Sequence, residues 1–304
     1  RHEGYSWGSP AYDNTGAPWV DRIVFRTLPE DAARAAELET GGIDLDVDVS
    51  PTHIARLEGK GVKVTSIPRL SSNHIGFNME KDVFKDVRVR KAVAHAVNRQ
   101  EIVQFVMKGQ ADVSYGFLHP LVPGASSKEQ MRPFMADFSL DKSKKLLGEA
   151  GWMPGADGMR QKDGKPLQAS LYVFTELHER IVTPVQAQLR QVGFDLQIKR
   201  LESAAFNAAT RAGEHDARFL PMIYSSGDFL YFFVSSAIPS PNTVRWRDDR
   251  TDTLFQQAQT TLKEPERVKA FQGIEQRLVG EAVVVPIQHI RWIFGRRKRE
   301  HGFK

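Results

Sequence analysis

The sequence predicts an α/β fold, because strand-like and helix-like segments alternate along most of its 304 residues. Strand-like runs such as 61–67 and 168–174 each lie next to a segment whose apolar residues recur every three or four positions. Apolar residues make up 41% of the chain and charged residues 26%, a composition typical of folded domains. The chain is long enough for one large domain or two ordinary ones, each with its own core.

The beginning of the chain predicts a small α/β unit with the order β-α-β-α-β. Pro29 suits the first turn of a helix, where Glu30 and Asp31 interact favourably with the helix dipole, and Gly41 with Gly42 ends the helix. Apolar residues then alternate with acidic ones, which predicts a strand with one acidic face. The expected elements are an ordered loop over 5–20, strands over 21–28, 43–49 and 61–67, and helices over 29–38 and 51–58.

Residues 71–99 predict a strand followed by two capped helices. The alternation from His74 to Met79 has a period of two, which indicates a strand. Asp86 is expected to cap the next helix, because its carboxylate can accept from the free N–H groups of the first turn. Asn98 together with Glu101 resembles the capping box that starts a second helix.

A second α/β unit is expected after a proline-containing loop over 115–140. Asp141 starts a helix that Gly151 ends, and two Asp-Gly pairs, at 157–158 and 163–164, predict hairpin turns. The remaining expected elements are strands over 168–174, 194–201, 219–224 and 283–287, and helices over 179–191, 203–212, 249–262 and 264–280.

Residues 219–246 predict a ligand-binding edge. The strand that opens this stretch leads into Ser225, Ser226, Gly227 and Asp228, and an aromatic cluster follows. Ligands of α/β sheets bind beyond the carboxyl ends of strands, where loops present short polar groups. The carboxylate suits a cationic group, and the aromatic residues offer a large apolar surface. The structural alternative is that the aromatic residues are helix core and the aspartate is an N-cap.

Several classes of site are excluded because the sequence lacks their residues. The absence of cysteine excludes disulfides, thiolate metal sites and cysteine nucleophiles. Glycine phosphate loops, zinc-protease helices and G-x-S-x-G elbows are also missing, so we expect no cofactor and no metal. No apolar run approaches the roughly 20 residues that cross a bilayer. The net charge of +5 includes the basic run 296–299, interpreted as a solvated strand end and not as a nucleic-acid site.

Three segments resemble the family-5 solute-binding proteins of ABC importers, the peptide, opine and nickel class. "GFN…VFKDVRVRKAVAHAVNR" is similar to the family's "GFN…PFKDVRVRKAVAYAIDR". "PWVDRIVFRTLPEDAARAAELETGGIDL" and "DKSKKLLGEAGW" resemble further family segments and occur in the family's order. The resemblance implies a type II periplasmic-binding fold, with two lobes joined by hinge strands.

The resemblance covers the C-terminal portion of a family member, so it implies a fragment with an incomplete first lobe. We expect residues 1–70 to form part of lobe I and residues 71–285 to form lobe II, with 286–304 as the return strand. The chain starts at Arg1 without the pattern of a signal peptide, so the export signal is expected outside this sequence.

The family's "WxxD" or "WTGD" motif, whose aspartate pairs with the α-ammonium of a peptide, corresponds here to "SSGD". Asp228 therefore carries the implied ammonium-binding role, and Gly227 matches some members. Ser225 stands where the family has tryptophan, which is a departure from the pattern, and Tyr224 is a candidate substitute. Phe229 completes the candidates on this turn. A further candidate, Asn78, lies in the "GFN" motif.

The resemblance implies a periplasmic, monomeric substrate-binding component of an ABC import system. It would capture a small molecule, a peptide, an opine or a related cationic or zwitterionic ligand, and deliver it to the permease subunits. The binding residues would act without catalysis, nucleic acid or a membrane span. One alternative is a ligand-presenting sensor of the same fold. Another is a hydrolase, assembled either from Ser225 and Ser226 near Asp228 or from residues 214–216.

Overall fold

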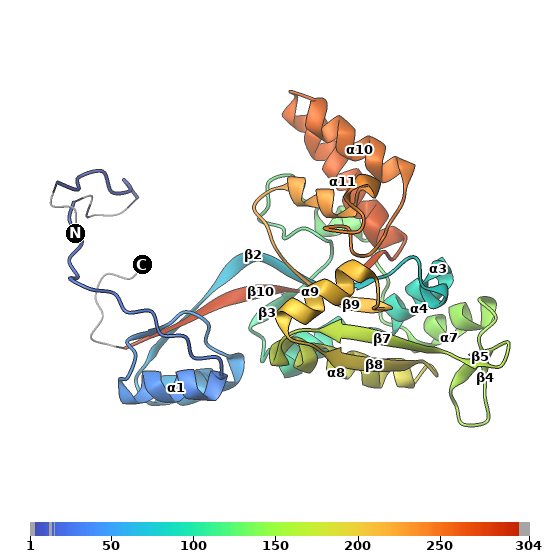
Figure 1. Ribbon diagram of the computed structural model, residues 1–304, viewed down its shortest axis with the longest axis horizontal. Coiled ribbons are helices and arrows are strands. Elements are labelled where there is room, and N and C mark those ends of the chain that lie inside the picture. The colour runs from blue at the N-terminus through green and yellow to red at the C-terminus, as the bar shows by residue number, and fades with distance from the viewer. Residues whose placement is uncertain (1–3, 12–13, 15, 298–304) are drawn as a thin grey trace.

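The computed structural model describes residues 4–11, 14 and 16–297, which contain a seven-stranded mixed sheet (Figure 1). The strand order is β1-β10-β2-β9-β7-β8, and β3 pairs with β10. The strands around β2 pair antiparallel, whereas β7 pairs parallel with both β8 and β9. The strands are β1 (Leu45–Asp46), β2 (Lys63–Phe77), β3 (Ala111–Val113), β7 (Gln168–Val173), β8 (Asp195–Arg200), β9 (Ala217–Ile223) and β10 (Val284–Arg296).

The long antiparallel pair β2 and β10 connects a small end of the molecule to a large end (Figure 1). The sequence predicts two strands, over 61–67 and 74–79, but the structure has one continuous strand there. Its first half alternates between exposed and partly buried residues, and its second half is buried throughout. Register shifts in β10 fall between Pro286 and Gln288 and between His289 and Arg291. The pair is therefore irregular where it enters the large end.

Two apolar cores cover opposite faces of the sheet at the large end. Ile75, Phe77 and Phe219 face the first core, which packs against the helices α4, α7 and α8. Leu220 and Met222, on the other face of β9, belong to the second core with α11. These opposite directions follow from the period-two geometry of strands. The helices of the large end are α3 (Asp82–Lys85), α4 (Val87–Ala96), α5 (Arg99–Glu101), α6 (Lys128–Met131), α7 (Leu140–Glu149), α8 (Glu176–Arg190), α9 (Ser203–Ala212), α10 (Asp249–Thr260) and α11 (Glu264–Gly280).

Two helices of the large end start at the predicted caps, whereas α7 starts at Leu140 with Ser139 as its cap and not at the predicted Asp141. The Asp86 carboxylate accepts from the backbone N–H of Arg88 at 2.8 Å and caps α4. Asn98 accepts from the N–H of Glu101 at 3.2 Å and caps α5, which continues as a π-helical segment over Ile102–Val106. The reciprocal half of the predicted capping box is missing, because the Asn98 N–H donates to the Gln188 side chain and not to Glu101. The Asp-Gly turns bracket β5, the central strand of a separate hairpin sheet. This sheet consists of β4 (Met153–Pro154), β5 (Arg160–Lys162) and β6 (Lys165–Pro166).

The small end has its own apolar cluster, formed by α1 (Asp31–Thr40), a short helical turn at Pro51–His53, α2 (Ile54–Gly59) and the adjoining halves of β2 and β10. Leu38, Leu57 and Ile293 are among its buried members. The predicted strand over 43–49 is reduced to the two residues of β1. Its predicted acidic face is also wrong in part, because Asp46 is buried and Val47 is exposed.

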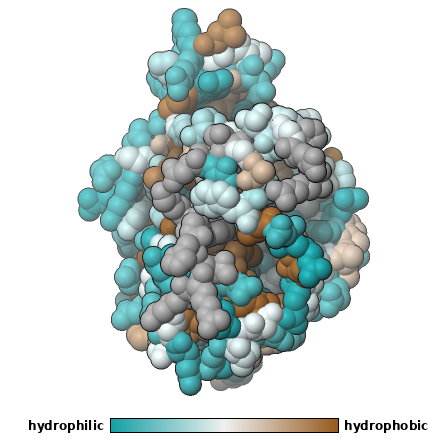
Figure 2. Space-filling view, turned by 90° about the vertical axis from the view of Figure 1, so that its left-hand side faces the viewer, coloured by the Kyte–Doolittle hydropathy of each residue, from teal (hydrophilic) through white to brown (hydrophobic). Residues whose placement is uncertain are grey.

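The predicted strand over 21–28 is wrong, because these residues have no regular secondary structure. They find no partner strand in the part of the chain that the structure describes, and backbone groups of a strand need one. Phe25 is 93% exposed, and Trp19, Ile23 and Val24 are exposed as well. Figure 2, which faces the small end, shows apolar residues among polar ones on this surface.

The predicted basic run over 296–299 lies partly outside the described residues. The basic run begins with Arg296 at the end of β10, but Lys298 and Arg299 lie outside the described part of the chain. Within the described part, none of the helices is both long and apolar enough to cross a membrane.

Candidate ligand-binding site

The predicted ligand edge is a tight helical turn at the carboxyl end of β9. The turn is a 3₁₀ helix, η3 (Gly227–Phe233), and its N-cap is Ser226. Asp228 therefore lies in the first turn and is not the cap, which corrects the structural alternative drawn from the sequence. The aromatic cluster is divided: Phe233 is buried, whereas Tyr231 is 43% exposed.

Asp228 presents an exposed carboxylate held by two neutral donors. The Ser226 hydroxyl donates to Oδ2 at 2.9 Å, and the Gln259 amide on α10 donates to Oδ1 at 2.9 Å. Among the described residues, none with a positive charge forms a salt bridge with this carboxylate. The carboxylate is thus fixed in position, and its charge is available to a cationic group.

Aromatic residues follow Asp228 on the same helical turn. The Phe229 ring lies 6.2 Å from the Tyr224 ring and 6.0 Å from the Phe232 ring, centroid to centroid. The Phe229 and Phe232 side chains are only partly buried. Such partly exposed aromatic residues give a ligand apolar contact area at a low cost in side-chain entropy.

Gly227 lets the turn pack directly on α11. A Cβ atom at this position would lie 2.3 Å from Cδ2 of the Phe271 ring, which is buried. The predicted candidate is therefore a close-packing position and has no side chain to offer a ligand.

We expect Gly227→Ala to lower the free energy of unfolding by about 1–3 kcal/mol, because the added methyl group overpacks a filled contact. Urea unfolding of the variant and the unchanged chain measures this difference. A double variant, Gly227→Ala with Phe271→Leu, should recover part of the loss. Equal stability of the single variant and the unchanged chain would contradict the proposed contact.

A buried polar cluster lies directly under the turn, where β2, β9 and β10 meet. The Tyr224 hydroxyl lies 2.5 Å from Ser72 Oγ and 2.6 Å from the Phe117 carbonyl oxygen. Ser72 Oγ is also 2.5 Å from Nδ1 of His289. Because a phenol carries one proton, it donates to one of its two neighbours at a time. The cluster connects the start of the turn at 225–233, called the ligand turn here, to the two long strands by hydrogen bonds.

Burial keeps the ionisable members of this region neutral. It lowers the pKa of His74 to about 4, and it also lowers the pKa of His289, whose ring lies 4.7 Å from that of His119. It raises the pKa of the Tyr224 hydroxyl, so the phenol keeps its proton. These groups therefore act as neutral hydrogen-bonding partners.

The buried cluster is the part of the site that sequence reasoning missed. Its only signal was the occurrence of polar residues inside otherwise apolar strands, at Ser72 and His74 in β2 and at Gln288 and His289 in β10. Both side-chain polar atoms of Gln288 are buried and lack partners among the described residues.

The structure does not bring Asn78 to the ligand turn. Its amide donates to the carbonyl oxygens of Gly213 and His215, at 3.2 and 3.1 Å, and its Oδ1 accepts from the N–H of Glu80. Asn78 lies beside the residues that precede β9, whereas the turn that carries Asp228 follows the other end of this seven-residue strand, about 20 Å away. Its polar atoms are fully engaged inside the fold.

The residues of the hydrolase alternative are also separated. His215 is buried at the beginning of β9, and Asp216 accepts from the Ser170 hydroxyl at 2.8 Å. Ser226 follows the other end of the strand. Within the described part of the chain, no group of three or more His, Cys, Asp or Glu residues could hold a metal ion.

Comparisons with known proteins agree on one family. Residues 1–243 match the profile described as bacterial extracellular solute-binding proteins, family 5 Middle. The chain is 27% identical over 271 residues to the oligopeptide-binding protein AppA of Bacillus subtilis, covering 86% of this chain and 49% of the relative. It is 27% identical over 303 residues to the nickel-binding periplasmic protein of Escherichia coli, covering 95% of this chain and 56% of the relative.

Solved structures agree with the sequence relatives. AppA of Bacillus subtilis, in complex with a nonapeptide, has a TM-score of 0.81 at 25% identity, covering 91% of this chain and 56% of that one. NikA of Brucella suis, in complex with Fe(III)-EDTA, has a TM-score of 0.78 at 25% identity, covering 91% of this chain and 57% of that one.

The chain spans about half the length of the curated relatives it matches. Its fold is that of the type II periplasmic-binding proteins, as the resemblance implied. The names of these two relatives describe binding proteins. The chain belongs to the bacterial extracellular solute-binding proteins of family 5.

Proposed function

We propose that the chain is part of a periplasmic substrate-binding component of an ABC import system. It captures a peptide, an opine or a related cationic or zwitterionic solute and delivers it to permease subunits. In this proposal residues 1–70 and 286–304 contribute to one lobe, and residues 71–285 form the other. A ligand between the lobes stabilises their closed arrangement by binding it more tightly than the open one.

The exposed carboxylate of Asp228 is the observation that carries this proposal. Two neutral donors orient it, and no described cation neutralises it. The partly exposed Phe229 and Phe232 follow it on the same helical turn. This combination suits a ligand with an ammonium group and an adjoining apolar portion. Relatives whose names specify oligopeptide and nickel binding support a small solute as the cargo.

A thermal-shift screen tests this proposal. The probes are di- to pentapeptides, opines, nickel–histidine and cello-oligosaccharides, and a ligand that binds only the folded state raises the melting temperature. We expect a compound with a free ammonium group to stabilise the chain. If every compound leaves the melting temperature unchanged, the proposal is wrong for this chain.

Asp228→Asn should weaken the binding of that compound by about 10- to 100-fold, because a hydrogen bond to a charged group contributes roughly 1.5–3 kcal/mol. Isothermal titration calorimetry measures the change. Glu58→Gln is the matched control, since Glu58 is an exposed residue of α2 and the substitution also removes one negative charge. Equal affinities of Asp228→Asn and the unchanged chain would rule out the assigned role of the carboxylate.

A further inference from the structure

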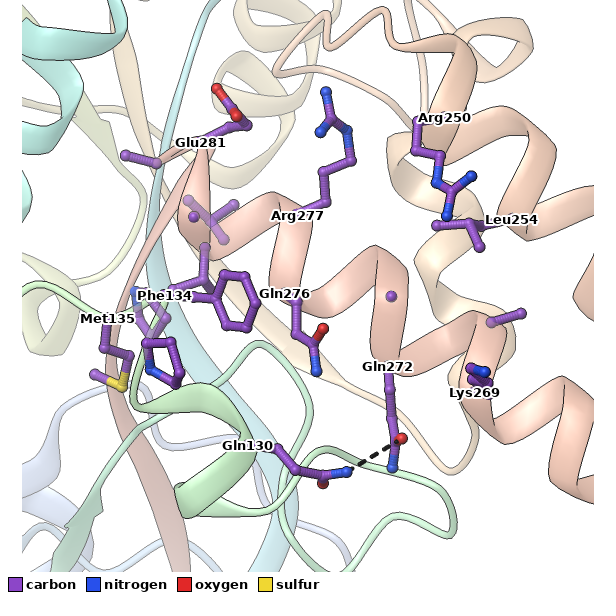
Figure 3. Close-up of a pocket in the computed structure, with 18 of the residues that line it drawn as sticks. Gln130, Phe134, Met135, Arg250, Leu254, Lys269, Gln272, Gln276, Arg277 and Glu281 are labelled. Carbon is purple, nitrogen blue, oxygen red and sulfur yellow. Dashed lines mark hydrogen bonds between the residues drawn. The ribbon is translucent and has the colours of Figure 1, made fainter.

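A large groove lies on the side of α10 and α11 that faces away from the turn carrying Asp228. It has a volume of about 1410 Å³ and is bounded by α10, α11, the loop over 130–136 and the end of α4 (Figure 3). On α10, Phe255 and Gln259 contact the ligand turn, whereas Arg250 and Leu254 line the groove. Residues four apart share one helix face, so the helix separates the two sites.

The groove carries more positive than negative charge. Lys91, Arg250 and Lys269 line it, and none of these three side chains has an ion pair or a side-chain hydrogen bond to another described residue. The lining has two acidic residues, Glu266 and Glu281. Glu266 forms an ion pair with Lys263 at 2.9 Å. The lining thus holds an excess of positive charge on both of its walls.

A buried arginine adds to the positive charge of the groove. Arg99 lines the groove with a side chain that is more than nine-tenths buried. Its Nε donates to the Pro286 carbonyl oxygen at 2.6 Å, and one Nη donates to that of Ala136 at 3.0 Å. Neither partner is a carboxylate, and Arg99 forms no salt bridge with another described residue, although the negative charge of Asp137 acts on it. Burying a cation in this way is costly unless an anion approaches it.

The other lining groups suit a polypeptide backbone. Gln130 and Gln272 bridge the two walls through a hydrogen bond of 3.4 Å, and Gln276 projects from α11 into the same space, beside Phe134 (Figure 3). Amide side chains supply both donors and acceptors, as a peptide backbone requires. The volume also exceeds the roughly 300–1,000 Å³ of ordinary small-molecule pockets.

We propose that this groove binds an extended acidic peptide segment presented by a partner protein. Carboxylates of the segment would pair with Lys91, Arg250 and Lys269, and the amide side chains would bind its backbone. The site is independent of the proposed solute site, because it lies on the opposite side of α10 and recognises negative rather than positive charge.

The probe is a hexaglutamate peptide with an acetylated N-terminus and an amidated C-terminus. It has no ammonium group, so its binding does not depend on the role proposed for Asp228. We expect saturable binding by fluorescence anisotropy, no binding of the matching hexalysine peptide, and competition by free citrate only at much higher concentration. Saturable binding that citrate displaces equally well would replace the peptide segment by a small carboxylate. Absence of hexaglutamate binding would overturn the proposal.

Variants locate the binding. The double substitution Arg250→Glu and Lys269→Glu should weaken hexaglutamate binding by about tenfold or more, since each reversal replaces an attraction of up to roughly 1 kcal/mol by a repulsion. Lys142→Glu with Lys144→Glu changes the net charge equally on α7, where both lysines are exposed. An equal loss in both double variants would show unspecific charge attraction and overturn the assignment to the groove.

Discussion

Lowering the pH from 6.5 to about 5 is expected to destabilise the folded chain by several kcal/mol. Burial lowers the pKa of His74 and His178 to about 4 and that of His215 to about 3, and it lowers the pKa of His289 as well. Nearby Arg218 adds to the effect at His215. In the unfolded chain these histidines bind protons near pH 6.5.

The direction in which pH changes the stability follows from proton binding. Below pH 6.5 the histidines bind protons in the unfolded state but stay neutral in the folded state. Their contribution to the free energy of unfolding is therefore present above this pH and is lost as the pH falls. Each histidine contributes roughly 1.4 kcal/mol per pH unit, and four together give about 5 kcal/mol per unit. Glu275 and Asp48 oppose them, because burial raises the pKa of both carboxyl groups and the folded state therefore binds their protons more tightly than the unfolded state does. Two opposing carboxyl groups against four histidines leave acid as the destabilising direction.

Urea unfolding across this pH range measures the slope. The variant His178→Leu isolates one histidine, whose ring lies between Phe174 and Phe219 and makes no hydrogen bond through Nδ1. Leucine suits these apolar neighbours, so the variant should fold and should lose roughly 1.4 kcal/mol per pH unit of the slope. An identical slope in both proteins would contradict the lowered pKa of His178.

The sequence was informative wherever an element is stabilised by contacts close in the chain. The cap at Asp86, the cap at Asn98 and the turns around β5 are local hydrogen-bonding patterns, and the structure confirms them. The strand expected over 21–28 depends on a distant partner strand. Its apolar residues fit a strand pattern, but the described part of the chain provides no such partner.

In the candidate site, too, the local features could be predicted from the sequence and the contacts between distant residues could not. The turn that carries Asp228 follows a strand with a clear pattern, and the family motif marks the aspartate. The cluster beneath it joins Ser72 to His289 and Tyr224 to Phe117, residues 217 and 107 positions apart. No periodicity links such pairs. Asn78 belongs to a family motif, but the structure places its side-chain amide against backbone carbonyl oxygens in the interior of the fold.

Replacing Glu275 by alanine is expected to cause the largest loss of stability of any substitution considered, about 4 kcal/mol. Glu275 lies on α11 and is fully buried. Its Oε1 accepts from the Leu118 N–H at 2.8 Å, and its Oε2 accepts from the Ser126 N–H at 2.9 Å. Removing the carboxyl group leaves two buried donors without partners, at a cost of roughly 1–3 kcal/mol each.

Two further variants show whether these hydrogen bonds cause the loss. Glu275→Gln keeps the size of the side chain and one acceptor oxygen, so it should lose about half as much stability as Glu275→Ala. Arg267→Ala, an exposed position on the same helix, should change stability by no more than about 0.5 kcal/mol. Urea unfolding at pH 7 gives all three values, and a Glu275→Ala loss as small as that of Arg267→Ala would refute the role of the carboxyl group.

The same side chain links the second core to the ligand turn. Glu275 fixes the loop that carries Phe117, and the carbonyl oxygen of Phe117 lies within hydrogen-bond distance of the Tyr224 hydroxyl. A loosened loop would therefore also release the residue from which the Asp228 turn begins. Glu275→Gln should accordingly weaken the binding of any ammonium ligand found in the screen, whereas Arg267→Ala should leave it unchanged. Weakened stability with full affinity in Glu275→Gln would show that the turn is held without this loop.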